Sequence, residues 1–373
     1  MKDLRVAVLG LGVMGSFHVD LLSTVVKGVT VTVVNDFVAS KAEQIAARIG
    51  ARAVADPIEA IHDPEVDAVL LASPGSTHAE QVNACLDAGK PVLCEKPLTT
   101  DAASSYAIVQ KERALGRTLI QVGFMRRFDP EYVALKELIT SGGLGNPLMV
   151  HCVHRNPTVP VHFDSEFMIR DSVVHEVDVT RFLLDEEITS VQVIKGVATA
   201  SAPPGAHDPM LVVFETASGR IVSDEIFVRT GVAYEVRTEV VGDAGSAVIG
   251  LDQNLQVKTT DGRWGGSITP GFVQRFGLAY HIELQRWVDA ASRGTIDGPG
   301  AWDGFAAVAV CEAGVRAVRT GRKEQVTLNA PEPPHGTGPN GQSHAGPMTA
   351  STHATNTPTP TPGPSRPAAT EEN

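Results

Sequence analysis

Hydrophobic positions in the first third of the chain follow two alternating periods. Short runs rich in β-branched residues predict buried strands, namely LRVAVLG (4–10), VTVVND (31–36), DAVLLAS (67–73), PVLCEKP (91–97) and TLIQVGF (118–124). Between these runs apolar residues recur at helical spacing, which predicts helices over 14–26, 39–49, 77–88 and 101–115. Thr77 and Glu80 predict a capping box at the start of the third helix. This alternation indicates βαβ units, so residues 1–122 are expected to form an α/β domain with a parallel sheet.

From residue 123 onward the pattern predicts a different kind of domain. A helix near 130–140 precedes a strand, LMVHCVHR (148–155), and a further helix is predicted over 171–184. Strand-like runs follow: SVQVIKGVA (190–198), MLVVFETA (210–217), RIVSDEIFV (220–228), YEVRTEVVG (234–242) and SAVIG (246–250). Short polar turns between them indicate a large, mostly antiparallel sheet. With helices predicted over 272–292 and 301–319, residues 123–330 are expected to form an α+β domain built on this sheet.

The last segment, 331–373, differs in composition from everything before it. It holds ten of the chain's 24 prolines and has no Val, Ile, Leu, Phe, Tyr or Trp. Such a segment cannot bury enough apolar surface to offset the entropy lost on ordering. We therefore expect a disordered, Pro-rich tail with no catalytic role.

Charge and cysteine content narrow the classes of partner and compartment. The formal net charge is −12, which disfavours binding to nucleic acid or to an anionic membrane surface. A small neutral substrate suits this surface better. The four cysteines form no CxxC pair, as is typical of reduced thiols, and no run approaches eighteen apolar residues. The sequence therefore predicts a soluble cytoplasmic protein.

The stretch Gly10-Leu11-Gly12-Val13-Met14-Gly15 predicts a dinucleotide site. It follows a predicted strand and opens a predicted helix, the context in which a GxGxxG motif is informative. Gly10 would permit the tight turn, Gly12 would let a pyrophosphate approach the backbone, and Gly15 would let helix and strand pack closely. Asp36 ends the next strand, where a ribose-binding acid belongs. The alternative is a glycine turn that serves only packing.

Two further stretches carry residues with catalytic chemistry. Lys96 lies in EKP (95–97), at the carboxyl end of a predicted strand, where open α/β sheets bind ligands. In DSVVHEVD (171–178), Asp171, His175 and Asp178 recur at helical spacing and would share one helix face. Taken alone, EKP could be a surface turn and the second stretch a solvated polar stripe. The alternative is a general base beside a carboxylate in a cleft.

Together these motifs resemble the Gfo/Idh/MocA oxidoreductases. The resemblance is carried by GLGVMG (10–15), SPGSTH (73–78), EKP (95–97) and DSVVHEVD (171–178), and it covers about residues 4 to 328. Within the family the chain is most similar to the inositol 2-dehydrogenases, through GFMRRFDPEYVALKE (123–137), HCVHRNPTV (151–159) and DSVVHEVDV (171–179). The resemblance implies a Rossmann domain for residues 1–122, with NAD as cofactor. It also implies that the domain over 123–330 binds substrate and mediates oligomerisation.

The resemblance also implies roles for individual residues. Lys96, Asp171 and His175 would form the catalytic trio, with His175 as general base, Asp171 orienting its ring and Lys96 holding the substrate oxygen. The residues that would hold NAD are Gly10, Gly12, Val13, Met14, Gly15, Asp36, Ser73, His78, Glu95 and Lys96. Those that would contact a polyol are Lys96, Arg126, His154, Asn156, Asp171, His175, Asp178 and Tyr234. Arg126 could instead brace the interdomain hinge, and Tyr234 could be a strand residue with no ligand contact. Asp178 could hold a residue that contacts the substrate instead of contacting the substrate itself.

The expected reaction is NAD-dependent oxidation of myo-inositol at C2 to 2-keto-myo-inositol. One alternative is a related dehydrogenase acting on another inositol isomer or a pyranose sugar. A second is an NAD-sensing protein without redox activity, which would be expected to lack the base or the lysine. His151 and His154 lie on a predicted strand and would point to opposite faces, so no metal site is predicted there. The resemblance further implies a homotetramer formed through the sheet of the second domain.

Overall fold

The structure is a computed structural model that describes residues 3–251, 257–260, 262–264 and 269–328. The chain divides into two units, Met1–Pro333 and Pro334–Asn373. The expected tail, 331–373, lies outside the described residues. Within the part that is described, no helix combines the length and apolar character needed to span a membrane.

The first sheet has six parallel strands in the order β3-β2-β1-β4-β5-β6, the doubly wound order of Rossmann folds. The strands are β1 (Leu4–Leu9), β2 (Val29–Asn35), β3 (Arg52–Ala53), β4 (Ala68–Leu71), β5 (Val92–Glu95) and β6 (Ile120–Gly123). The helices between them are α1 (Val13–Thr24), α2 (Ala39–Ile49), α3 (Pro57–His62), α4 (Gly75–Asp87) and α5 (Ala102–Leu115). The predicted parallel α/β domain is thus confirmed. The sequence pattern missed only β3 and α3, which are too short to show a period.

The predicted capping box at Thr77 is wrong. Helix α4 begins at Gly75 with Pro74 as its N-cap, so Thr77 already lies in the first turn. Its hydroxyl donates to the Pro74 carbonyl at 2.8 Å and to Ser73 Oγ at 3.0 Å. The helix starts earlier than expected because Pro74 and Gly75 turn the chain directly after β4.

The second sheet has seven strands in the order β12-β11-β7-β10-β9-β8-β15. They are β7 (Pro147–Arg155), β8 (Ile188–Lys195), β9 (Met210–Thr216), β10 (Ile221–Phe227), β11 (Glu235–Gly242), β12 (Ser246–Ile249) and β15 (Glu324–Gln325). Only the pair of β7 and β10 is parallel among the pairs described in this sheet, so the mostly antiparallel prediction is confirmed. A separate hairpin is formed by β13 (Val257–Thr259) and β14 (Gly262–Trp264).

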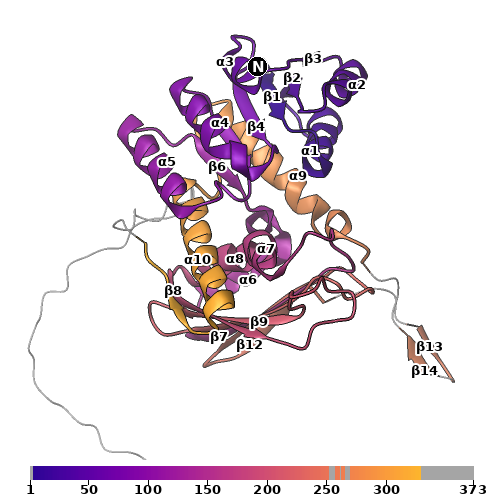
Figure 1. Ribbon diagram of the computed structural model, residues 1–373, viewed down its shortest axis with the longest axis vertical. Coiled ribbons are helices and arrows are strands. Elements are labelled where there is room, and N and C mark those ends of the chain that lie inside the picture. Colours follow the sequence, from indigo (N-terminus) through magenta and orange to yellow (C-terminus); the bar gives the residue numbers. More distant parts are fainter. Residues whose placement is uncertain (1–2, 252–256, 261, 265–268, 329–373) are drawn as a thin grey trace, which may run out of the picture. The chain divides into compact units, whose positions relative to one another are not determined.

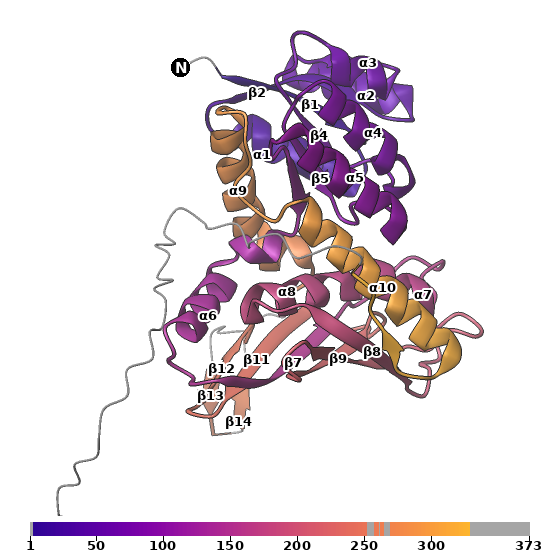
Figure 2. The same ribbon diagram turned by 90° about the vertical axis from the view of Figure 1, so that its left-hand side faces the viewer.

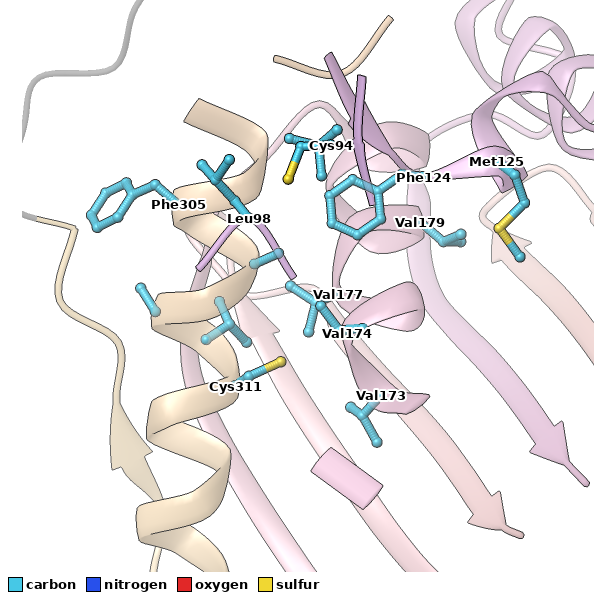
Figure 3. Packing of buried hydrophobic residues seen from close by; sticks show 14 of the residues in the cluster. Cys94, Leu98, Phe124, Met125, Val173, Val174, Val177, Val179, Phe305 and Cys311 are labelled. Carbon is cyan, nitrogen blue, oxygen red and sulfur yellow. The ribbon is translucent and has the colours of Figure 1, made fainter. Parts of the chain in front are cut away.

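One face of this sheet is covered by helices (Figure 2). The covering elements include α6 (Pro130–Thr140), α7 (Ser165–Met168), α8 (Val174–Leu184) and α10 (Ala301–Thr320), and the 3-10 turn η1 (Met125–Phe128) leads into α6. Figure 3 shows Val174 and Val177 of α8 between α10, with Cys311, and the end of the first sheet, with Phe124. All four of these side chains are buried, so α8 is fixed in rotation and its polar residues have defined directions.

Helix α9 (Phe272–Ala291) follows the second sheet but packs against the first domain (Figures 1 and 2). Its Leu284 and Trp287 share a buried cluster with Leu4, Val8 and Leu22. The first domain therefore completes its core with residues from the second half of the chain. The domain limits 1–122, 123–330 and 331–373 remain a prediction.

The helix predicted over 171–184 begins three residues later than expected. Helix α8 starts at Val174, and residues Ile169–Val173 form a π-helical turn, η2. A wider turn of this kind is rare and is frequent at functional sites. Asp171 therefore lies in the π-helical turn and His175 in the α-helix, so the two side chains are not related by regular α-helical spacing.

Candidate active site

The glycine loop between β1 and α1 has the geometry that a dinucleotide requires. Gly10 has φ of +86°, and a side chain there would lie 2.4 Å from the Ser73 nitrogen. A side chain at Gly15 would lie 1.8 Å from the Gly10 carbonyl oxygen, so both positions need glycine. Gly12 is the N-cap of α1, and a Cβ there would meet nothing within 4 Å. The loop thus leaves open space before a helix N-terminus, where phosphate anions bind favourably.

Asp36 is held beside this loop by two backbone donors. The N–H of Leu11 donates to Asp36 Oδ2 at 2.7 Å, and the N–H of Val38 donates to Oδ1 at 2.8 Å. Asp36 is partly exposed and follows β2, while the next residue, Phe37, is fully exposed. The carboxylate is therefore fixed at the carboxyl end of β2, and its remaining lone pairs can accept hydrogen bonds from hydroxyl groups.

Ser73 and His78 belong to the loop after β4 and contact each other. The Ser73 hydroxyl donates to Gln81 at 2.6 Å. His78 is buried, and its two ring nitrogens lie 2.9 Å from the Ser73 carbonyl oxygen and 2.8 Å from that of Pro97. His78 thus ties this loop to the one that carries Lys96. Its expected contact with a cofactor stays a prediction.

Lys96 and Asp171 are joined across the two domains. Lys96 Nζ donates to the Asp171 carboxylate and to its backbone carbonyl, each at 2.9 Å. Their side chains are 18% and 36% exposed, so both remain reachable from solvent. A cavity of about 480 Å³ opens beside this pair. The expected orientation of His175 by Asp171 stays a prediction, because the described partner of Asp171 is Lys96.

His175 lies in the first turn of α8 and is 9% exposed. Its ring centroid is 6.4 Å from that of His154 and 6.4 Å from that of Phe124. Burial, followed by the nearby charges of Lys96, Arg126 and His154, lowers the pKa of His175 well below 6.5. The imidazole is therefore neutral at physiological pH and able to accept a proton.

Arg126, one of the charges that lower the pKa of His175, belongs to a buried ion pair. Its guanidinium donates to Glu176, and both side chains are 1% exposed. Glu176 also pairs with His154 Nδ1 at 3.1 Å, and the His154 ring lies against Tyr234, with centroids 6.1 Å apart. Burial opposes ionisation of Glu176, but Arg126 and His154 outweigh it and lower its pKa. Arg126 therefore braces the wall of the site, and its expected contact with substrate stays a prediction.

Asn156 and Asp178 differ in how the structure uses them. The Asn156 side-chain oxygen is buried without a hydrogen-bond partner among the described residues, which leaves an acceptor available to a ligand. Asp178 is 1% exposed and accepts hydrogen bonds from Nε and Nη2 of Arg127, which also pairs with Asp303. This network already uses the Asp178 carboxylate, and its expected contact with substrate stays a prediction. His151 and His154 do lie on opposite faces of β7, as predicted.

Comparison with known families identifies the two domains that carry these residues. The Gfo/Idh/MocA family sequence model described as "Oxidoreductase family, NAD-binding Rossmann fold" matches residues 4–124. The model of the family's C-terminal alpha/beta domain matches residues 136–328. The chain belongs to the Gfo/Idh/MocA oxidoreductase family.

Similar members of the Gfo/Idh/MocA family carry inositol dehydrogenase names. The inositol 2-dehydrogenase of Rhodococcus erythropolis is 62% identical over 335 residues, which cover 88% of this chain and 97% of that protein. The inositol 2-dehydrogenase of Mycolicibacterium gilvum is 60% identical, covering 88% and 95%. The crystal structure of a Lactobacillus casei myo-inositol dehydrogenase with NAD(H) and myo-inositol is 32% identical, with a TM-score of 0.85 and coverage of 89% and 99%.

Within this Gfo/Idh/MocA site, the sequence patterns missed two residues that the structure brings into it. Glu176 lies inside the DSVVHEVD stretch and is the buried partner of Arg126 and His154. His18 lies on α1, three residues after the last motif glycine, and is the buried partner of Glu95. The only sequence signal for either was an ionisable residue within an apolar helix face, which does not identify its partner.

Proposed function

We propose that the protein is an NAD-dependent inositol 2-dehydrogenase, which oxidises the C2 hydroxyl of myo-inositol to give 2-keto-myo-inositol. The observation that carries the proposal is the junction of Lys96 and Asp171 beside a buried, neutral His175. The names of the most similar relatives support the same reaction and substrate class.

His175 is the general base of the proposed reaction. Its low pKa keeps the imidazole free of a proton, so it accepts the proton of the substrate hydroxyl as the C–H bond breaks. NAD, when bound, supplies the acceptor for the hydride that leaves the same carbon. Lys96 then stabilises negative charge that develops on the substrate oxygen, and Asp171 holds the lysine head group in place.

The residues that would hold NAD line the carboxyl ends of the parallel strands. Gly10, Gly12 and Gly15 shape the loop for the pyrophosphate, and Val13 and Met14 follow as the first residues of α1. Asp36 would accept hydrogen bonds from the adenosine ribose. The open space before Gly12 and the fixed carboxylate of Asp36 both fit this group.

Asp36 should set the preference for NAD over NADP. Its carboxylate would repel the additional phosphate of NADP, and neither Phe37 nor Val38 supplies a positive charge. Asp36→Ala should lower kcat/KM with NAD. It should also reduce the ratio of kcat/KM with NAD to kcat/KM with NADP by roughly 10–100-fold, since hydrogen bonds to a charged group contribute about 1.5–3 kcal/mol. The measurement is kcat/KM for both cofactors.

A companion variant separates charge from loop anchoring. Asp36→Asn keeps an oxygen that can accept a hydrogen bond from the Leu11 N–H and removes the charge. It should therefore reduce the preference for NAD over NADP while lowering kcat/KM with NAD less than Asp36→Ala does. Asp20→Ala, at an exposed acid on α1, is the matched control and should change neither cofactor. Equal use of NADP by the wild-type protein would contradict the assignment of Asp36.

The pH profile should report the depressed pKa of His175. A general base acts only when unprotonated, and this imidazole stays unprotonated at pH values below its ordinary 6.5. We therefore expect the acid limb of kcat/KM to fall below pH 6.5. Steady-state rates between about pH 5 and 9 measure it. An acid limb above pH 6.5 would mean that another group titrates or that His175 is not the base.

His154, Asn156 and Tyr234 are the proposed contacts for ring hydroxyls. The ring of Tyr234, which is 8% exposed, lies against His154. Asn156, whose side-chain oxygen has no described partner, follows two residues after His154, just beyond the end of β7. Hydroxyl groups of a cyclitol can both donate and accept, which suits an amide, a phenol and an imidazole. A negatively charged substrate would instead require an unpaired cationic side chain here, and Arg126 is already paired with Glu176.

A panel of substrates tests the proposed function directly. The purified full chain is incubated with NAD and a set of cyclitols and pyranose sugars, and NADH absorbance is followed. We expect the highest kcat/KM with myo-inositol. A higher value with another isomer or a sugar would reassign the substrate within the same enzyme class. Binding of NAD without turnover of any member would favour the NAD-sensing alternative.

We further propose that subunits pair through the uncovered face of the second sheet, as part of a cytoplasmic homotetramer. Apolar side chains on this face are 37–49% exposed, namely Met149, Ile194, Leu211, Ile221 and Val248. Ile221 pairs with Met149 on the neighbouring strand, so the two form one apolar surface. The four cysteines are free and buried, which supports a reducing compartment.

Sedimentation of two variants tests the pairing. Ile221→Asp should shift the protein toward smaller species, because a carboxylate would be buried against the partner. Leu278→Asp, at a 58% exposed position on α9, is the matched control and should sediment as the wild type. A wild-type protein that sediments as a monomer would contradict the proposal.

A further inference from the structure

His18 forms a buried pair with Glu95, directly before the catalytic lysine. The His18 side chain is 0% exposed, and its Nε2 lies 2.7 Å from Glu95 Oε1. The imidazole is packed edge-on against Tyr280 of α9, with ring centroids 5.8 Å apart. The pair thus joins α1, which begins at the glycine loop, to the carboxyl end of β5, where Lys96 follows.

The second oxygen of Glu95 is directed at the backbone of Lys96. Glu95 Oε2 accepts the Lys96 N–H at 3.2 Å. The same oxygen lies 3.1 Å from the position of a Cβ on Gly123, in the neighbouring strand β6. A side chain at residue 123 would therefore press on the carboxylate, and glycine leaves it room.

Lys96 is consequently held at both ends. Asp171 holds its ammonium group, whereas Glu95 holds its backbone N–H. The position of Glu95 depends in turn on His18, which supplies the described side-chain donor to this carboxylate. Glu283 is also buried nearby, and burial together with the charge of Glu95 raises the pKa of Glu283. A Glu95 carboxylate without its donor would lie in an apolar, acidic environment.

Packing alone does not account for a histidine at this position. The Nδ1 atom of His18 is buried and has no hydrogen-bond partner among the described residues, which costs free energy that an apolar side chain would avoid. The imidazole differs from an apolar side chain in making the Nε2 hydrogen bond with Glu95. An apolar residue of similar size would fill the space between α1 and α9 and lose only that contact.

We propose that His18 is a positioning residue for the dehydrogenase reaction: it holds Glu95 in the orientation that fixes the backbone of Lys96. This inference rests on the proposed function for its kinetic consequence, but its structural part concerns the backbone of Lys96 alone. The effect should fall on turnover more than on cofactor affinity, because Lys96 stabilises charge that develops in the transition state.

Three substitutions in the full chain test the proposal. His18→Leu removes the donor and keeps the volume, and should lower kcat by roughly 10–100-fold, the size of effect produced by a small misplacement of a catalytic group. The dissociation constant of NAD should stay within about threefold. His18→Gln presents an amide N–H close to the position of Nε2 and should recover most of kcat. His18→Asn is too short to reach Glu95 and should resemble His18→Leu.

Hydrogen exchange provides a readout that does not require turnover. The Lys96 amide, followed by mass spectrometry in a peptide that spans β5 and EKP, should exchange faster in His18→Leu and His18→Asn than in wild type. In His18→Gln it should exchange at the wild-type rate. If His18→Leu fails to fold, the comparison of His18→Gln with His18→Asn decides the same question.

The outcomes separate this proposal from the proposed function. Equal kcat in wild type and His18→Leu, or equal losses in the Gln and Asn variants, would overturn the positioning role. A loss confined to NAD affinity would overturn it as well. A wild-type protein inactive toward every cyclitol and sugar of the panel, with the exchange pattern as expected, would overturn only the dehydrogenase assignment and would support the effect of His18 on the Lys96 backbone.

Discussion

His175→Ala is expected to lower kcat by roughly 10²–10⁴, the range observed when a general base is removed. The imidazole is 9% exposed on the first turn of α8, its pKa is depressed by burial and by nearby cations, and Lys96 and His154 surround it. The variant keeps the helix, because alanine is a strong helix former and Val174 and Val177 still anchor α8. Affinity for NAD, measured by fluorescence titration, should change little.

The control for His175 is a histidine outside the site. His62 is exposed at the end of α3, so His62→Ala should keep full activity. Restoration of turnover in His175→Ala by added imidazole would add direct support for a missing base. Turnover of His175→Ala within threefold of wild type would remove His175 from the catalytic role.

Lys96→Met is expected to lower kcat by roughly 10²–10³, the loss typical of removing one donor to a developing oxyanion. Methionine keeps an unbranched side chain about as long as the aliphatic part of lysine and removes the ammonium group. Affinity for NAD should change far less, because the ammonium group is directed at Asp171 and the cavity beside it. Steady-state kinetics with saturating NAD, together with a separate NAD titration, measures both quantities.

The same variant should also move the pH profile. Lys96 is one of the charges that lower the pKa of His175, so its removal should shift the acid limb of kcat/KM to higher pH. Lys111→Met, at a partly exposed position on α5, is the matched control. A Lys96→Met variant that loses only NAD binding and keeps its rate at saturation would show that Lys96 is a cofactor ligand.

Local patterns predicted the elements of the fold well. Buried β-branched runs and helical spacing were sufficient for β1, β2 and α1, because the GxGxxG motif marks the turn between strand and helix. The same holds for the alternating strands of the second sheet, whose inner residues are buried one by one. Motif and resemblance together gave Lys96, Asp171 and His175, and the fold does bring these three residues to one place.

The partners of the site residues could not be predicted in this way. The pairing of Arg126 with Glu176, 50 residues apart, depends on how η1 crosses α8. The π-helical turn at Ile169–Val173 has no sequence signal, yet it gives the Asp171 carboxylate to Lys96. Such contacts follow from packing between distant segments, and a period along the chain reports only which face is buried.

The return of α9 to the first domain has a consequence for biosynthesis. A nascent chain that has left the ribosome only as far as the second sheet still lacks Leu284 and Trp287, which cover Leu4 and Leu22 of the first domain. The dinucleotide domain therefore cannot finish burying this cluster during synthesis until α9 has been made. Nonsense or frameshift products that end before α9 would expose this apolar surface, and cells should remove them by proteolysis instead of accumulating a free NAD-binding fragment.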